Sequence, residues 1–182
     1  AVLSEYGDIA QTIQEEGFDV RDRILSAIAG GTRTAMAKSI GLLEVSVVDI
    51  LSRDVPDWVV LAGDRAEQLA AATACAYTYT PSAHIQAGER SGNIDGIARH
   101  AIGRLVNLHF ASNEDAATRL TRSVEAAWRV HNVGAPQLDE IVNGLVTDAD
   151  GLAQAGLMPS GPFILACFHP VTEDYVGIRR QI

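Results

Sequence analysis

A set of polar side chains stands in or just beyond the loops that follow predicted strands, where an open α/β sheet binds its ligands. Carboxylates gathered at such an edge can exchange protons, and a neighbouring Arg or His can hold a phosphate. Each residue alone also fits an ordinary structural role, such as a helix cap or a solvated charge, so the interpretation rests on their combination. The set comprises Asp64, Arg65, Gln86, Glu89, Asp95, Arg99, His100 and His169.

The loops around these residues lack the signatures of several common sites. The sequence contains no GxGxxG dinucleotide turn, no Walker phosphate loop, no HExxH motif and no GxSxG nucleophile turn. His, Cys and acidic residues do not recur at the spacing of a metal site, so neither a metal nor a cofactor is predicted. Glycines beside the acids would let a ligand approach the backbone closely.

Short apolar runs alternate with helical patterns along most of the chain, which indicates a Rossmann-like α/β domain. The run at 57–62 predicts a buried parallel strand, and the Ala-rich stretch at 66–77 predicts a helix close to it. A parallel sheet flanked by helices on both faces is expected, with Ser112 or Asn113 capping one helix. The other predicted strands cover 82–85, 108–111 and 129–133, with alternation also at 18–24, and the other helices cover 34–51 and 94–105.

The chain is predicted to hold one domain and the start of another. Residues 1–143 are expected to form an N-terminal Rossmann-like domain that lacks its first strand. The glycine-rich stretch 144–161 is interpreted as an interdomain connection, and 162–182 as the incomplete beginning of a C-terminal Rossmann-like domain. Within that last part, 163–168 predicts a buried strand that ends just before His169.

Charge and composition restrict the class of partner. The 182 residues include 23 Asp and Glu against 14 Lys and Arg, a net charge of −9, and no basic cluster offsets it. A nucleic-acid surface is therefore not expected. Cys75 and Cys167 are interpreted as buried thiols of a reducing compartment, and His109 and His131 as structural residues. No apolar run is long enough to span a membrane and no signal-like segment opens the given sequence, so a cytoplasmic location is expected.

Three long blocks of the sequence carry a family resemblance. They are PDWVVLAGDRAEQLAAA at 56–72, HIQAGERSGNIDGIARHAIGRLVNLHFAS at 84–112 and RVHNVGAPQLDEI at 129–141. Together they resemble the hydrolysing UDP-N-acetylglucosamine 2-epimerases, which serve the biosynthesis of sialic acid and related sugars such as legionaminic acid. SEYGDIAQTIQEEGF at 4–18 and FHPVTED at 168–174 resemble the family's early region and the opening of its second domain.

The resemblance implies a GT-B-like protein in which a UDP-sugar lies between two Rossmann-like domains. The family's usual chain is about twice as long, so the sequence is interpreted as truncated at both ends. A first strand would precede Ala1, and most of the second domain would follow Ile182. The resemblance further implies a homodimer or homotetramer, with no nucleic-acid or membrane partner.

The resemblance also implies a reaction and roles for the site residues. Such enzymes eliminate UDP across C1 and C2 of the sugar and hydrate the resulting glycal to N-acetylmannosamine. Asp64 and Asp95 are then expected to be catalytic, and His169 to stabilise the charge of the departing diphosphate. The residues expected to bind substrate or to support the catalytic groups are Arg65, Gln86, Glu89, Arg99 and His100.

Gln86 departs from the family pattern, in which glutamate is common at this position. A glutamine can form hydrogen bonds but cannot take up a proton at neutral pH. Either Asp95, Asp64 or Glu89 carries the role of base, or the protein acts on another sugar, UDP-2,4-diacetamido-2,4,6-trideoxyglucose. The remaining alternatives are lost activity, a non-hydrolysing epimerase, a glycosyltransferase of similar shape, and a non-catalytic binding or interaction fragment.

Overall fold

The computed structural model describes residues 9–29, 32–123 and 126–144, together with Ala153, Gly156, Ile164, 166–168 and Arg180. The chain divides into two compact units, 1–134 and 135–182. The predicted boundaries at 143 and 161 stay a prediction. In chain order the elements are α1 (Ile9–Glu15), α2 (Arg33–Asp54), β1 (Val59–Ala62), α3 (Ala66–Tyr77), β2 (Ser82–Ala87), α4 (Ile94–Leu105), β3 (Leu108–Ala111), α5 (Glu114–Ser123), η2 (Ala127–Arg129), β4 (Val130–Asn132), η3 (Pro136–Leu138) and α6 (Asp139–Val142).

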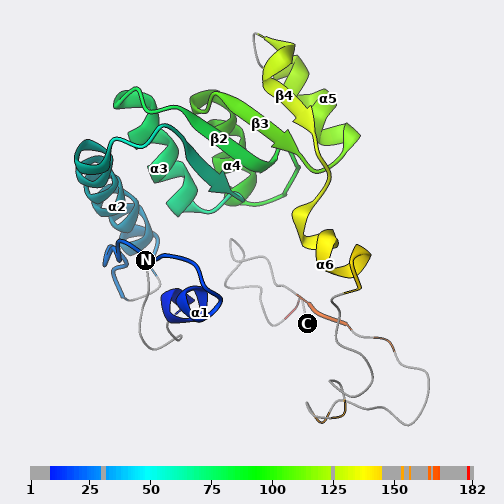
Figure 1. The fold of residues 1–182 in the computed structure, drawn as a ribbon, viewed down its shortest axis with the longest axis horizontal. Helices are drawn as coiled ribbons and strands as arrows, with labels where there is room; N and C mark the ends of the chain where they lie inside the picture. Colours follow the sequence, from blue (N-terminus) through cyan, green and yellow to red (C-terminus); the bar gives the residue numbers. More distant parts are fainter. Residues whose placement is uncertain are drawn as a thin grey trace. The chain divides into compact units, whose positions relative to one another are not determined.

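The first unit is built on a parallel sheet with the strand order β1-β2-β3-β4 (Figure 1). Each strand is joined to the next by one of α3, α4 and α5, which confirms the predicted Rossmann-like class. The helices at 66–77 and 94–105 and the strand at 108–111 begin and end at the predicted residues. The amphipathic and apolar patterns of these segments therefore sufficed to predict their bounds.

The segment 18–24 forms no strand, so that prediction is wrong. Ion pairs hold this part of the chain against the end of α2, in place of backbone hydrogen bonds to a neighbouring strand. Arg53 donates to Asp22 at 2.6 Å, and Arg21 lies 3.7 Å from Asp54. Alternation alone could not reveal this, because a strand also needs a neighbour for its backbone groups.

One face of the sheet carries the helices of the first unit. Leu61 of β1 packs with Ala72 of α3 and Ile102 of α4, and Ala111 of β3 packs with Leu120 of α5. These strand residues point to the same side, because His84 and His109 align with Leu61 across the sheet and Ala111 lies two residues beyond His109. The prediction of helices on both faces is therefore wrong for the described residues. Right-handed connections between strands in sequential order place every connecting helix on one side.

The described residues of the second unit do not form the strand predicted at 163–168. Ile164 and 166–168 have no strand conformation, and Ile164 is 94% exposed. Cys75 is buried as predicted, but Cys167 is exposed, so that part of the thiol prediction is wrong. Residues 163 and 165 lie outside the described residues, and none of the four described strands pairs with Ile164 or 166–168. Within the described ranges, no helix combines the length and apolar character needed to cross a membrane.

Candidate functional site

The turn after β1 is held by the neighbouring strand β2. Gly63 has a φ of +86°, a conformation that glycine adopts without strain. Its N–H donates to the carbonyl oxygen of Ile85 at 3.2 Å, and its own carbonyl accepts a hydrogen bond of 2.6 Å from Nε2 of His84. Both backbone groups of Gly63 are thus fixed by consecutive residues of β2, and Asp64 follows directly.

The end of β2 is bent by a bulge at Gln86. The register with β3 shifts between Ile85 and Ala87, and Gln86 itself has a φ of 60°. This left-handed conformation costs a residue with a Cβ about 1–2 kcal/mol. At Gly88, a Cβ would stand 2.6 Å from Cγ of Leu120, so only glycine fits there. The bend ends the strand and leads the chain into the loop that carries Glu89.

A buried guanidinium joins the two carboxylates at this edge. Arg99 of α4, whose side chain is 10% exposed, donates to Asp64 and lies with Nη1 3.9 Å from Oε2 of Glu89. Ser112, the residue after β3, donates from its hydroxyl to the other oxygen of Glu89. Asn113, not Ser112, caps α5, with its Oδ1 accepting from the Ala116 N–H at 2.9 Å. The sheet and α4 therefore bring Asp64, Glu89 and Arg99 together at this edge.

Asp95 lies one helical turn before Arg99 on α4. Residues four apart share one face of a helix, so Asp95 is placed on the face that carries the Arg99 side chain. Asn93 donates to its carboxylate at 2.8 Å. The loop is kept close to the helix by Gly96, where a Cβ would stand 2.4 Å from the carbonyl oxygen of Ser91. The side chain of Asp95 is half-buried, and within the described residues no ion pair joins it to a guanidinium.

Two predicted site residues, Arg65 and His100, lie apart from the contacts of this cluster within the described residues. Arg65 is largely exposed and its Nε lies 3.4 Å from Glu67. His100 is exposed and is turned about 100° from Arg99 around the helix axis. His169 lies outside the described residues. The roles expected for all three stay predictions. Over the described ranges, no three His, Cys, Asp or Glu side chains converge as a metal site would need.

Two buried histidines lie side by side beneath this edge. His84 of β2 and His109 of β3 are in register and fully buried. Burial lowers the pKa of His84, and it lowers the pKa of His109 to about 4, helped by the charge of Arg129. Both imidazoles are therefore neutral near pH 7. Sequence reasoning missed a role for His84, although a polar residue at an inward position of a buried strand must find a partner.

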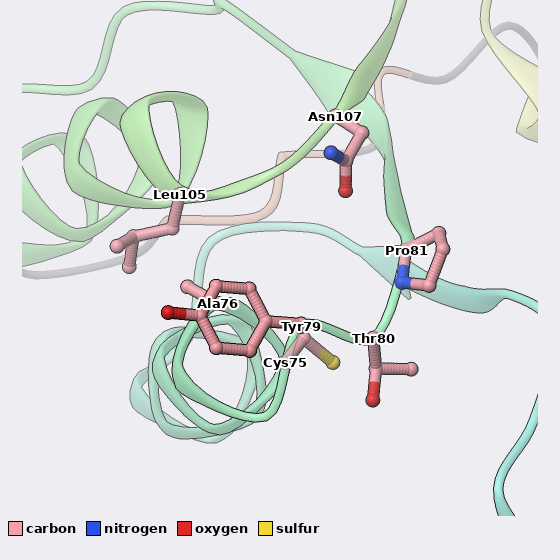
Figure 2. A pocket seen from close by; sticks show the side chains of 7 residues that line it. All are labelled: Cys75, Ala76, Tyr79, Thr80, Pro81, Leu105 and Asn107. Carbon is pink, nitrogen blue, oxygen red and sulfur yellow. The ribbon is translucent and has the colours of Figure 1, made fainter.

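The opposite edge of the sheet holds a hollow of about 210 Å³ (Figure 2). It is lined by residues that precede β2 and β3, among them Tyr79, Pro81 and Asn107. In Figure 2 the Tyr79 ring lies beside the hollow, close to Cys75 and Thr80. None of the predicted site residues lines it, and parallel sheets bind ligands at the other edge. The hollow is therefore separate from the charge cluster.

Comparisons with known proteins point to one family. The family model described as UDP-N-acetylglucosamine 2-epimerase matches residues 3–179. The chain is 35% identical over 177 residues to a UDP-N,N′-diacetylbacillosamine 2-epimerase (hydrolyzing) of Legionella pneumophila, covering 97% of the chain and 47% of that protein. It is 33% identical over 131 residues to a UDP-N-acetylglucosamine 2-epimerase of Neisseria meningitidis, covering 71% of the chain and 35% of that protein.

A solved structure agrees with these sequence matches. The fold is similar to that of UDP-N-acetylglucosamine 2-epimerase from Rickettsia bellii, with a TM-score of 0.67 and 25% identity. The match covers 86% of the chain and 42% of that structure. The chain thus spans about half the length, or less, of these relatives.

Proposed function

Because the chain belongs to the UDP-N-acetylglucosamine 2-epimerase family, we propose that the full-length protein is a hydrolysing 2-epimerase of a UDP-2-acetamido sugar. The observation that carries this proposal is the cluster of Asp64, Glu89 and Arg99 at the carboxyl edge of the sheet, with Asp95 one turn away. Carboxylates at a ligand-binding edge supply the acid and base that such chemistry needs. The name of the Legionella relative, which contains the word hydrolyzing, supports the type of reaction.

In the proposed reaction, a base removes the proton at C2 while the bond between C1 and the UDP oxygen breaks. A glycal and UDP result. Water then adds across the double bond, and its hydroxyl is bonded to C1. A proton is delivered to C2 on the face opposite to the one from which the first proton was removed. The products are UDP and a free sugar epimerised at C2. His169, by the resemblance, would stabilise the departing diphosphate.

The surroundings of the carboxylates favour different tasks. Asp64 is held by the buried Arg99 and is thereby kept in a defined position. Within the described residues, Asp95 accepts a hydrogen bond from the amide of Asn93 and pairs with no guanidinium, so its carboxylate oxygens are available to take up a proton from the substrate. We therefore assign proton transfer at C2 to Asp95 and orientation of the sugar to Asp64, with Glu89 completing the anionic edge.

We propose UDP-2,4-diacetamido-2,4,6-trideoxyglucose, the diacetylbacillosamine nucleotide, as the first substrate to test. Two relatives that match nearly the whole chain act, by their names, on UDP-N,N′-diacetylbacillosamine. The amide of Gln86 can hydrogen-bond an acetamido group, whereas it cannot transfer a proton. UDP-N-acetylglucosamine is the second candidate, supported by the Neisseria relative. The homodimeric or homotetrameric state and the cytoplasmic location stay predictions.

The test is to incubate the full-length protein with each UDP-sugar and to follow UDP release and the sugar product by NMR. The expected products are UDP and the free 2-epimer. Release of a nucleotide-linked epimer would instead identify a non-hydrolysing enzyme. If both UDP-sugars stay intact, the epimerase proposal fails and a binding role becomes the alternative. We expect Asp95→Asn to abolish turnover with the fold intact, and unchanged turnover would remove Asp95 from the mechanism.

A further inference from the structure

The turn that presents Asp64 is not held by packing. A Cβ placed on Gly63 would meet no atom within 4 Å, so the space around this residue is open. Glycine in an open turn has wide conformational freedom, and some other interaction must select one conformation. That interaction comes from β2, whose Ile85 carbonyl accepts the Gly63 N–H and whose His84 ring donates to the Gly63 carbonyl.

The bond from His84 identifies the protonated nitrogen of its ring. A carbonyl oxygen only accepts hydrogen bonds, so Nε2, at 2.6 Å from it, must carry the proton. Nδ1 is buried and has no hydrogen-bond partner among the described residues, which fits a neutral ring with a lone pair on Nδ1. Burial, the largest cause, and the nearby charge of Arg99 lower the pKa of His84, although the hydrogen bond to Gly63 and the charge of Asp64 raise it in part. The ring therefore stays a neutral donor around pH 7.

The bond also fixes the position of Asp64. The Gly63 carbonyl belongs to the peptide group that leads into Asp64, so orienting this carbonyl orients the Asp64 backbone. From that position the Asp64 carboxylate meets Arg99, which comes from a different element, α4. A rotated peptide would move the carboxylate away from a guanidinium that is itself buried and unable to follow.

We infer that His84 is a positioning residue for Asp64, acting through the carbonyl of Gly63. The inference rests on the proposed function, since it assumes that the position of Asp64 matters for turnover. His84 does not touch the substrate in this account. It selects the conformation of the turn so that Asp64 is already paired with Arg99 when a sugar nucleotide binds.

The test compares two substitutions of His84 in the full-length protein. His84→Leu removes the donor, and kcat is expected to fall about tenfold to a hundredfold while KM changes little, because a misplaced group affects the reaction more than binding. His84→Gln keeps an N–H at the same reach and should restore most of the loss. Equal losses in the two variants would overturn the inference.

His109 provides the matched control. It is equally buried and lies beside His84 in the sheet, but neither of its ring nitrogens forms a hydrogen bond within the described residues. His109→Leu and His109→Gln are expected to leave kcat within about threefold of the wild type. A loss of kcat in His109→Leu as large as in His84→Leu would show that any change to the buried layer disturbs the site, and would refute a specific role for His84.

A second measurement does not depend on turnover. In ¹⁵N NMR spectra, His84 is expected to be the neutral Nε2–H tautomer from pH 7 to 8. The amide signal of Asp64 reports on the Gly63 carbonyl in the same peptide group, so it should move in His84→Leu and return in His84→Gln. An Nδ1–H tautomer, or an unmoved Asp64 amide, would overturn the inference. Absence of wild-type turnover would refute the proposed function alone, with the positioning of Asp64 then decided by these spectra.

Discussion

The two edges of the sheet are built from similar loops but differ in what those loops carry. At the carboxyl edge, Asp64 and Glu89 meet a guanidinium that is almost fully buried. At the amino edge, the polar groups serve each other: Asn107 accepts from the Ser82 N–H at 2.9 Å and returns a bond from its own N–H to Ser82 at 2.8 Å. The carboxyl edge therefore presents charged groups, whereas the hydrogen bonds at the amino edge join the start of β2 to the residue before β3.

Both edges also contain a residue other than glycine in the left-handed region. Gln86 has a φ of 60° and Tyr79 a φ of 57°. Gln86 stands beside the charge cluster, whereas Tyr79 is 93% exposed at the rim of a hollow that contains no predicted site residue. Backbone strain therefore does not distinguish the edges, but buried charge does. Strain marks a candidate site only when it accompanies groups that can do chemistry.

The largest expected difference between the two edges is the effect of Asp64→Asn on turnover. Asparagine keeps the shape and can still accept from Arg99, but it loses the charge. Turnover by the full-length protein is expected to fall about a hundredfold, the loss expected when a group that orients the substrate no longer does so. The control is Asp115→Asn, which changes an 83% exposed carboxylate on α5 and should leave turnover unaltered. Steady-state kinetics with equal thermal unfolding curves would separate chemistry from folding.

Arg99→Met tests whether burial gives this ion-pair cluster its importance. The substitution leaves two carboxylates, Asp64 and Glu89, without their shared cation. We expect the free energy of unfolding to fall by about 2–4 kcal/mol, measured by urea titration. Arg53→Met is the matched control, because Arg53 also lies between two carboxylates but is solvent-exposed. Its loss should be much smaller, since water screens a surface pair; similar losses would contradict the argument.

The gathering of polar residues at the carboxyl edge of the sheet could be predicted from the sequence, but the contacts within the cluster could not. Polar residues after successive strands must share an edge, which is why Asp64 and Glu89 were expected together. The burial of Arg99 was not foreseeable, because a helix Arg next to His100 is ordinarily solvated. Its partners come from β1 and the loop after β2, and only the fold brings them within reach.

The helices and strands of the fold could be predicted from the sequence, but two features of the sheet could not. Apolar periodicity located the helices and strands, since local pattern determines which face each element buries. The bulge at Gln86 was not predicted, because glutamine carries no preference for the left-handed region and the bend depends on contacts of Gly88 with α5. The single helix-covered face of the sheet was also missed. It follows from strand order, which local periodicity does not encode.

Low pH should reduce the free energy of unfolding through the buried His109 beneath the carboxyl edge. The pKa of His109 is about 4, against about 6.5 for an unfolded histidine. As the pH falls from 6.5 to 4, the His109 ring binds a proton in the unfolded chain but not in the folded chain, so the free energy of unfolding decreases. The loss attributed to His109 is about 2–3 kcal/mol at pH 4 and absent above pH 7. His109→Leu should remove this part of the pH dependence in urea titrations.

The control for the acid effect is a core variant without a titratable group. Ile102→Val removes one methylene from a fully buried side chain of α4, at a cost of about 1 kcal/mol. That cost should be the same at pH 7.5 and pH 4.5, whereas the effect of His109→Leu should differ between them. An unchanged pH dependence in His109→Leu would show that the ring titrates alike in the folded and unfolded protein, which would contradict a lowered pKa.

The smallest expected effect concerns the two strained residues. Glycine at either position relieves a left-handed conformation worth about 1–2 kcal/mol and adds about 0.5–1 kcal/mol of chain entropy to the unfolded state. Tyr79→Gly and Gln86→Gly should therefore each raise stability slightly, by under about 1 kcal/mol. Only Gln86→Gly should reduce turnover, because only that position contributes an amide at the edge that carries Asp64 and Glu89. Equal turnover in the two variants would remove Gln86 from the site, and a loss in Tyr79→Gly would show that the amino edge takes part in the reaction.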